Sequence, residues 1–254
     1  MPNERLRDSM QSNGFSPAGL ASELGVDPKT VERWITKGRA PYPKYRREVA
    51  ALLKERENYL WPDVLPADKQ IAVSESELVK TYPRRYAVPN DLWARLLDQA
   101  TDFIGVLAYA GLFLPEQTDL IGKIKAKAKS GTKIVVLLGD PESEAVALRG
   151  AEEGIGGAMA EKVRNVLTYY NQLEGVPGVF VGYHDTALYN SIYKFDNEML
   201  VNTHILGCPA AHAPVLHLKE LAGGTMFQTF SDSFDRVWSR SKNVWTHEHG
   251  KVKP

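Results

Sequence analysis

The sequence predicts an α/β chain built of two parts, a small all-α module followed by a larger α/β domain. Within the first 60 residues, capping residues stand directly before prolines, which is a pattern that begins helices. After about residue 81, short and continuously apolar runs alternate with helical patterns, as in a sheet with crossover helices. The length of 254 residues also suits about two domains.

The segment over residues 15–41 reads FSPAGLASELGVDPKTVERWITKGRAP and has the pattern of two helices joined by a short turn. Ser16 and Asp27 each precede a proline that can begin a helix, and Gly25 can end the first helix. A turn of about three or four residues makes the helices cross steeply, as in a DNA-reading helix-turn-helix. The second helix has an apolar face, and its other face carries residue types that reach bases or phosphates: Lys29, Thr30, Arg33 and Lys37. The alternative is a helical hairpin with a solvated charged face.

Further helices are expected over about residues 3–12 and in the run YPKYRREVAALLKERENYLW. The basic residues that flank the second helix are expected to contact phosphate, with a solvated surface charge as the alternative for each: Arg39, Lys44, Arg46 and Arg47. The whole chain has a formal net charge of zero, but the first 60 residues hold 11 lysines and arginines against 8 aspartates and glutamates. The basic excess therefore lies with the helical module.

The pattern LASELGVDPKTVERWITKGR resembles the repressor-type (lambda repressor and Cro, or XRE) helix-turn-helix family of transcription regulators. Its extension GRAPYPKYRREVAALLKERENYLWPD resembles a branch common in actinomycetes, and together the two cover about the first quarter of the chain. The resemblance implies a double-stranded DNA operator as partner. Many members have glutamine where Pro17 stands and glutamate where Ile35 stands, so the phosphate contact of that glutamine is not carried over.

We expect the module over residues 1–62, a linker over 63–80, the α/β domain over 81–245 and a flexible tail over 246–254. In the second domain the patterns predict helices over 92–100, 117–129, 142–152, 159–171 and 227–238. Strands are predicted over 103–110, 132–138 and 179–183, and a hairpin of 191–195 and 199–203 turns at Asp196-Asn197. The first two strands and the helix between them form a parallel β-α-β unit.

Two stretches of the second domain carry candidate site residues. Gly139-Asp140-Pro141 lies between a buried strand and a helix, where the backbone cradles an anion or simply caps the helix. In the run HDTALYNSIYKFDNEMLVNTHILG, residues 184–207, polar side chains are interleaved with strand-forming residues. This second run is the more distinctive of the two.

The second domain resembles the phospholipase D-like fold over about residues 82–238, through AVPNDLWARLLDQAT, VLAYAGLF, IVVLLGDPESEA and LYNSIYKFDNEMLVNTHILG. Active members of that fold use a nucleophilic histidine, a lysine two residues later, and an aspartate or asparagine five residues further on. The corresponding positions here are Asn190, Ile192 and Asn197. A carboxamide is no nucleophile and isoleucine cannot neutralise phosphate, so we expect no catalytic residues and no enzyme activity.

The same run is expected to keep a polar ligand pocket near the lost motif. The candidate ligand-binding residues are Tyr189, Asn190, Lys194, Asp196 and His204. Because successive side chains of a strand point to opposite faces, two or three of these polar side chains are expected in the pocket.

Other signals bear on location and on metals. Cys208 is the single cysteine, the N-terminal residues lack an apolar signal core, and no apolar run approaches a membrane span, so a cytoplasmic, nucleoid-associated protein is expected. His212 and His217 are five residues apart without further ligands at zinc-site spacing. We expect neither a metal nor a cofactor.

Together these signals predict a sequence-specific DNA-binding transcription regulator whose second domain forms a homodimer, with a small-molecule effector as a further candidate partner. Two alternatives stay open. One is a phosphodiesterase or nuclease-like enzyme directed to DNA by the helical module, which would need an intact histidine-lysine pair. The other is an adaptor that binds a protein and no ligand, which a closed or apolar site at the strand ends would favour.

Overall fold

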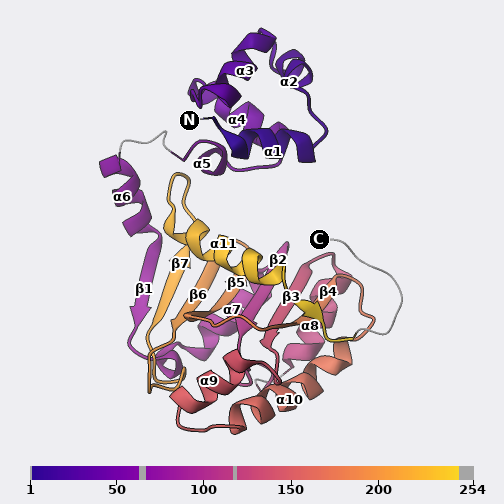
Figure 1. Cartoon of the computed structure of the whole chain (residues 1–254), viewed down its shortest axis with the longest axis vertical. Coiled ribbons are helices and arrows are strands. Elements are labelled where there is room, and N and C mark those ends of the chain that lie inside the picture. The colour runs from indigo at the N-terminus through magenta and orange to yellow at the C-terminus, as the bar shows by residue number, and fades with distance from the viewer. Residues whose placement is uncertain (1, 63–66, 117–118, 246–254) are drawn as a thin grey trace. The chain divides into compact units, whose positions relative to one another are not determined.

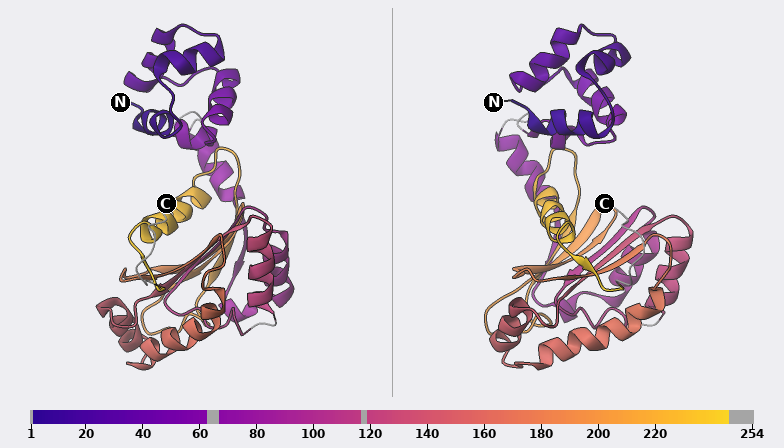
Figure 2. Two further views of the ribbon diagram at one scale, coloured as in Figure 1. Left: turned by 90° about the vertical axis from the view of Figure 1, so that its right-hand side faces the viewer. Right: turned by 45° about the vertical axis from the view of Figure 1, so that its right-hand side comes forward.

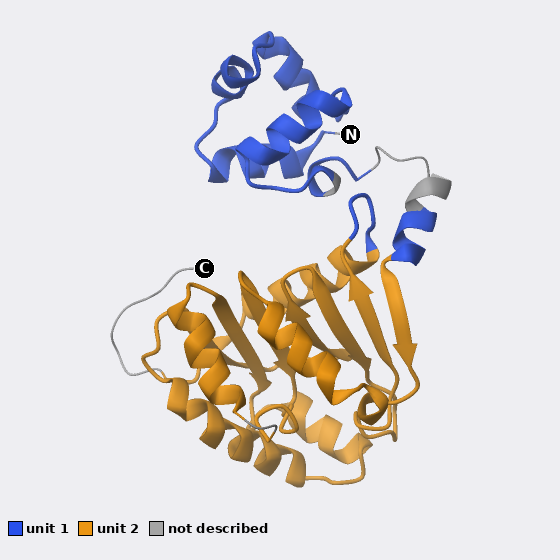
Figure 3. Ribbon diagram, turned by 180° about the vertical axis from the view of Figure 1, so that it is seen from behind, with its two compact units in different colours: residues 1–76, 221–225 blue, residues 77–220, 226–254 orange. Residues whose placement is uncertain are grey.

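The structure is a computed structural model that describes residues 2–62, 67–116 and 119–245. The chain divides into two compact units, residues 1–76 with 221–225 and residues 77–220 with 226–254 (Figure 3). The predicted tail over 246–254 and the first part of the predicted linker, 63–66, lie outside the described residues. Across the described part of the chain, no helix has the length and apolar character needed to cross a membrane.

Unit 1 is all-α, which confirms the predicted helical module (Figure 1). Its helices are α1 (Glu4–Ser12), α2 (Pro17–Leu24), α3 (Pro28–Thr36), α4 (Pro43–Leu52), α5 (Glu57–Leu60) and α6 (Ala67–Ser76). The run after Pro41 was expected to form one helix, but it forms α4 and α5. Lys54 has a φ of 54°, a left-handed conformation that cannot continue a helix, so the chain turns between the two.

The helix starts on either side of the short turn are as predicted. Ser16 caps α2 by accepting a hydrogen bond from the Gly19 amide at 3.0 Å, and Asp27 caps α3 through the Lys29 amide at 2.8 Å. Gly25 ends α2 with a φ of 64°, the conformation that glycine adopts at least cost. Local capping therefore places α2, the turn and α3 where the sequence predicts them.

Buried apolar side chains from α1 to α5 form one core, which includes Leu6, Leu20, Val31, Trp34, Val49 and Leu60. Two asparagines tie distant segments to α1. The Asn3 side chain donates to the Leu60 carbonyl at 2.6 Å, and the Asn13 side chain donates to the Leu53 carbonyl at 3.0 Å. All members of this core lie within residues 2–62.

Unit 2 is a mixed α/β domain, which confirms the predicted fold class. Its strands are β1 (Leu78–Tyr82), β2 (Phe103–Ala108), β3 (Lys133–Gly139), β4 (Val179–His184), β5 (Asn190–Phe195), β6 (Glu198–Thr203), β7 (Val215–Lys219) and β8 (Lys242–Asn243). Among the described residues they form one sheet in the order β1-β7-β6-β5-β2-β3-β4-β8. β2, β3 and β4 are parallel and the other neighbouring pairs are antiparallel.

Helices cover both faces of this sheet (Figure 2). One face packs against α7 (Asn90–Gln99), α8 (Leu120–Lys129), α9 (Glu144–Glu152) and α10 (Ala158–Tyr170). The other face packs against α11 (Met226–Trp238), whose Phe227 and Phe234 are fully buried. Because side chains alternate along a strand, β3 contributes to both cores, which explains its continuously apolar run IVVLL.

The expected linker is wrong beyond residue 66, because α6 and β1 occupy most of residues 67–80. β1 pairs with β7 at the sheet edge, and only Tyr82 of its five residues is buried. An edge strand with one exposed side lacks the apolar run that identified the central strands. β7 and β8 were missed as well; each is at most five residues long and is defined by its pairing partners.

Candidate nucleic-acid interface and strand-end pocket

The outer face of α3 carries the polar row that the sequence predicts. Val31, Trp34 and Ile35 are buried in the core of unit 1. The side chains of Lys29, Arg33 and Lys37 are exposed, and Thr30 is half-buried. The structure thus leaves these four groups on the surface, where they can contact a partner.

A groove of about 600 Å³ lies in front of α3. It is lined by Thr30 and Arg33 of α3 and by the segment that leads into α4, including Arg39, Tyr42, Tyr45 and Arg46. The Tyr42 side chain is 77 % exposed, which is unusual for a large aromatic residue. Two of the predicted contact residues on α3 therefore share one concave surface with Arg39 and Arg46, whereas Arg47 lies outside it.

Arg46 differs from the other basic residues of this surface. Its Nη1 donates to the Pro41 carbonyl at 3.0 Å and its Nε donates to Glu57 at 3.3 Å, and its side chain is 16 % exposed. Lys44 is exposed and lies 4.0 Å from Glu48. Arg47 is also exposed, whereas Arg46 holds the segment after α3 onto α5.

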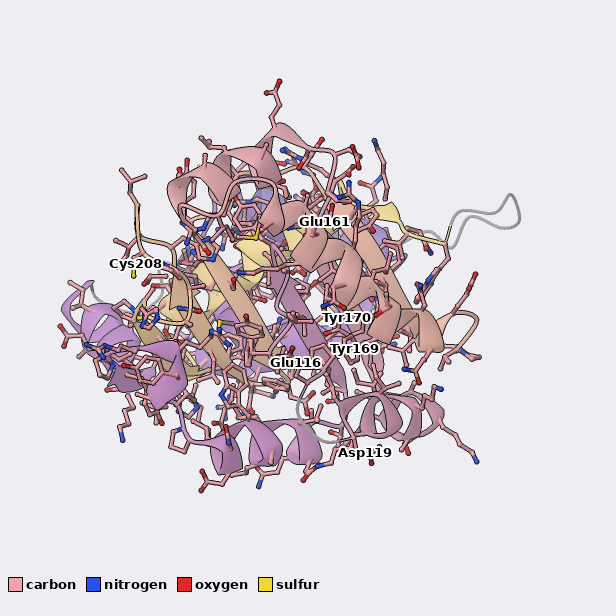
Figure 4. The ribbon with its side chains drawn as sticks, turned by 90° about the horizontal axis from the view of Figure 1, so that it is seen from below. Glu116, Asp119, Glu161, Tyr169, Tyr170 and Cys208 are labelled. Atoms are coloured by element: carbon pink, nitrogen blue, oxygen red, sulfur yellow. The ribbon has the colours of Figure 1, made fainter. Side chains whose placement is uncertain are left out.

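Unit 2 contains a pocket of about 270 Å³ at the carboxyl end of β2, beside the first residues of the antiparallel strand β5. Figure 4 views the chain from this side and labels Glu116, in the segment before α8, and Cys208, in the loop after β6. Polar lining residues are Arg85, Tyr109, Glu116, Glu153, Lys162, Ser191, Tyr193 and His204. The other lining residues are small or apolar and include Leu112, Phe113, Met159 and Pro209.

A directed hydrogen-bond chain forms the floor of the pocket. The Nδ1 atom of His204 lies 3.1 Å from the Leu188 carbonyl, which can only accept, so Nδ1 carries the proton. Nε2 of the neutral ring therefore accepts the Ser191 hydroxyl at 3.0 Å. Burial lowers the pKa of His204 to about 4, so the ring is neutral at physiological pH.

Two tyrosines border this chain. Burial raises the pKa of Tyr193, and the Arg85 guanidinium and a hydrogen bond with Ser191 act in the opposite direction. The Tyr109 ring stacks on His204, with centroids 5.5 Å apart, and its hydroxyl accepts the Leu188 amide at 2.9 Å. His204 is therefore held between the Tyr109 ring, which follows β2, and the Leu188 carbonyl, which precedes β5.

The loop after β6 contributes Pro209, Ala210 and Ala211 to the pocket and is held by Arg149 of α9. The Arg149 guanidinium donates to the Ile205 and Cys208 carbonyls at 3.5 and 3.0 Å. It also pairs with Glu152 at 3.3 Å and Glu153 at 2.7 Å, and its side chain is 3 % exposed. One buried cation therefore joins α9 to the loop.

The structure separates most of the ligand-binding residues that the sequence predicts, and only His204 lines the pocket. Tyr189 is 85 % exposed, and Asn190 is half-buried at the start of β5. Lys194 lies against α11, where its Nζ donates to the Ser231 hydroxyl at 2.5 Å. Asp196 sits in the β5–β6 turn, where it accepts the Thr101, Asp102 and Phe103 amides.

The expected grouping of two or three of these residues is therefore wrong, for two physical reasons. Alternation sends Lys194 to the face opposite Ser191 and Tyr193. The length of β5 carries Asp196 to the far end of the strand. Ile192 is fully buried on the α11 side of the sheet. Asn190 lies two residues earlier in the same strand, so its side chain points to that side as well.

The turn after β3 matches the capping alternative. Ser143 caps α9 by accepting the Val146 amide at 3.3 Å, and its hydroxyl donates to the Asp140 carbonyl at 2.7 Å. Asp140 itself accepts the Glu142 amide at 2.9 Å. These contacts satisfy the groups that an anion would otherwise bind.

Sequence reasoning missed Ser191, Tyr109 and Arg85. The first two had a signal, since Ser191 shares its strand face with Tyr193 and Tyr109 directly follows β2. Arg85 had none. It belongs to a short 3-10 turn, residues Arg85–Ala87, that reaches the pocket only through the tertiary fold.

Comparisons with known proteins identify similar structures only. No family model matches the chain, and no curated protein matches its sequence. TrmBL2, an archaeal chromatin protein with a novel mode of DNA binding, is 15 % identical, with a TM-score of 0.41 over 78 % of this chain and 62 % of that one. Nuc from Salmonella typhimurium, a phospholipase D family member, is 12 % identical, with a TM-score of 0.36 over 61 % of this chain and 90 % of that one. This chain thus spans about three fifths of TrmBL2, and at these TM-scores its function has to be argued from its own residues.

Proposed function

We propose that the chain is a sequence-specific DNA-binding transcription regulator of the cytoplasm whose α/β unit pairs two copies and responds to a small ligand. The observation that carries the proposal is the exposed row on α3, where Lys29, Arg33 and Lys37 face outward while the opposite side of the helix is buried. Within a helix-turn-helix, a helix of this kind enters the major groove of DNA. The capped turn that fixes α3 beside α2 supports the same assignment.

We assign roles within this surface by reach and by chemistry. Arg33 and Thr30 lie along the groove in front of α3 and read base edges, Arg33 through two hydrogen bonds to guanine. Lys29, Lys37, Arg39 and Lys44 contact phosphates, since lysine and arginine heads bring charge without needing base-edge geometry. Arg46 is bound within the module and positions the neighbouring segment.

Substitutions on α3 separate the two roles. Arg33→Ala should weaken binding to the preferred site by about 1–3 kcal/mol and relax preference at one base pair, because a bidentate contact is lost. Lys37→Ala should weaken binding to all sequences alike and reduce the slope of log affinity against log salt by about 1. Gel-shift titrations at several salt concentrations, on a site selected from random DNA, measure both effects.

Arg7→Ala is the matched control, because Arg7 is an exposed arginine of α1 that pairs with Glu4. It removes the same charge without touching the groove in front of α3. Loss of preference in Arg7→Ala, or wild-type binding by Arg33→Ala, contradicts the assignment of α3 as the reading helix.

Pairing of two copies is the second part of the proposal. Four exposed apolar side chains surround the loop after β6: Leu148, Tyr189, Ile205 and Leu206. The segments that carry them meet, since the His204 amide donates to the Tyr189 carbonyl and Arg149 donates to the Ile205 carbonyl. Apolar groups gathered in this way favour a protein contact over solvent, and a dimer suits a module that reads only a few base pairs.

Light scattering tests the pairing. The wild-type chain should be a dimer, and Leu206→Glu should be a monomer because it places a charge in this patch. Val79→Glu should stay dimeric, because Val79 is a comparably exposed apolar residue on the edge strand β1. On DNA, the dimer should prefer half-sites about 34 Å apart, one helical turn. A wild-type chain that is monomeric both free and on DNA would exclude the dimer.

We further propose that the chain has no phosphodiesterase activity at the position of the lost motif. The support is chemical, because Asn190 offers no nucleophile and Ile192 is a fully buried apolar side chain. Regulation by a ligand then requires only that binding favours one arrangement of the paired units, and a coupling of about 1–3 kcal/mol suffices.

A further inference from the structure

We infer that the strand-end pocket binds a small organic carboxylate with an apolar ring or chain, and that Arg85 holds its carboxylate. This inference names the ligand class for the sensing part of the proposed function and rests on that function for its regulatory meaning. The binding itself follows from the charges, hydrogen bonds and walls of the pocket.

The floor of the pocket has few donors left for a ligand. The Ser191 proton is directed at His204 Nε2, and the His204 Nδ1 proton is directed at the Leu188 carbonyl. Because the neutral imidazole cannot serve as a cation at physiological pH, the charge that recognises a ligand has to come from elsewhere.

Arg85 supplies that charge. Its side chain is half-buried, and its guanidinium lies 3.7 Å above the centre of the Phe113 ring. Within the described ranges, no carboxylate forms an ion pair with it. A guanidinium stacked on an aromatic ring keeps its edge donors in a planar fork, which matches the two oxygens of a carboxylate.

The acidic residues of the lining do not cancel this cation. The Glu153 carboxylate is neutralised by Arg149, at 2.7 Å, and Glu116 is exposed, so water screens its charge. Lys162 also lines the pocket and is exposed. The pocket therefore contains one half-buried positive charge without an acidic partner, which suits a single negative charge.

The remaining walls favour an apolar group attached to that anion. Leu112, Phe113 and Met159 line the pocket, and the Phe113 ring meets Tyr193 edge to face with centroids 5.6 Å apart. A volume of about 270 Å³ has room for one ring or short chain besides the carboxylate. Since Pro209 to Ala211 also line the pocket, the ligand would touch the same loop that carries Ile205 and Leu206.

Benzoate, benzamide and benzamidine test the charge requirement, because they share a ring and differ in the charge of the head group. Saturation-transfer NMR with the full chain and no DNA should show benzoate binding, with benzamide at least about tenfold weaker and benzamidine absent. Phenyl phosphate should bind no better than benzoate. Equal binding of benzoate and benzamide, tighter binding of phenyl phosphate, or no binding of benzoate each overturns the inference.

Two neighbouring arginines provide the matched variants. Arg85→Met keeps the length of the side chain, removes the guanidinium, and should weaken benzoate binding by about tenfold or more. Arg84→Met should bind benzoate as wild type does, because Arg84 is exposed, contacts Tyr86 and does not line the pocket. Ala211→Trp, which fills the pocket from the loop, should abolish benzoate binding. Unchanged binding in Arg85→Met and in Ala211→Trp would place the ligand elsewhere.

The benzoate-binding test and the DNA-binding test of the proposed function can fail independently of each other. A chain that binds benzoate through Arg85 but binds no DNA supports the pocket and removes the regulator. A chain that binds its DNA site but not benzoate removes this inference alone.

Discussion

Arg149→Met should lower the free energy of unfolding of the α/β unit by about 3–5 kcal/mol, the largest effect that we expect from a single substitution. Arg149 is 3 % exposed, and the Glu153 side chain that it pairs with is 7 % exposed. Without the guanidinium, a buried carboxylate loses its counter-charge. The Cys208 carbonyl also loses the donor that lies 3.0 Å away.

A second substitution shows whether the unpaired charge causes the loss. Arg149→Met combined with Glu153→Leu should recover about 2 kcal/mol, because an apolar pair of similar volume avoids the buried charge. Arg164→Met is the control, since Arg164 pairs with Glu142 and Glu161 on the surface, where solvent screens both pairs. It should leave the unfolding transition unchanged.

Urea titration of the full chain, followed by near-ultraviolet circular dichroism, measures these differences. Equal stability of Arg149→Met and wild type would show that water reaches this cluster. No recovery in the double variant would instead assign the loss to the loop carbonyls.

Asp196→Ala should lower the free energy of unfolding by about 3 kcal/mol, because one carboxylate satisfies several donors at the turn before β2. Oδ1 accepts the Asp102 and Phe103 amides at 3.0 and 2.7 Å, and Oδ2 accepts the Thr101 amide at 2.8 Å. Asp196 also has a φ of 47°, which aspartate and asparagine tolerate better than alanine. Asp196→Asn keeps this turn preference and one acceptor oxygen, so it should cost roughly half as much.

The pH dependence gives an independent test of Asp196. Burial would raise the pKa of Asp196, but the Thr101, Phe103 and Asp102 amides outweigh it and hold the pKa below its usual value. A carboxyl whose folded pKa is depressed stabilises the fold above the unfolded pKa, about 4, and loses this contribution as pH falls through the folded pKa. Unfolding measured from pH 6 to pH 3 should show a shallower loss of stability in Asp196→Asn than in wild type.

Glu198 contributes to the same acid response in both chains. Burial would raise the pKa of Glu198, but hydrogen bonds from Arg95 and His217 hold it below its usual value. The difference between wild type and Asp196→Asn therefore isolates Asp196. Identical slopes would show that the turn amides do not depend on this carboxylate.

Features with local causes could be predicted from the sequence. Ser16, Gly25 and Asp27 set the ends of α2 and α3 through contacts with residues two to four positions away. Apolar runs identified β2, β3 and β4, because strands buried on both faces need little information from their partners. Asp196 and Asn197 likewise marked the β5–β6 turn.

Features that depend on residues distant in the chain could not be predicted from the sequence. β1 is a strand because β7 lies beside it, and the pocket combines Arg85, Tyr109, Ser191 and His204 from separate segments. In the sequence, Arg149 cannot be told apart from an exposed charged residue of a helix. In the structure, the loop after β6 covers it. Capping and burial periodicity act within a few residues, whereas pocket membership depends on strand order and register, which the pairing of the whole sheet sets.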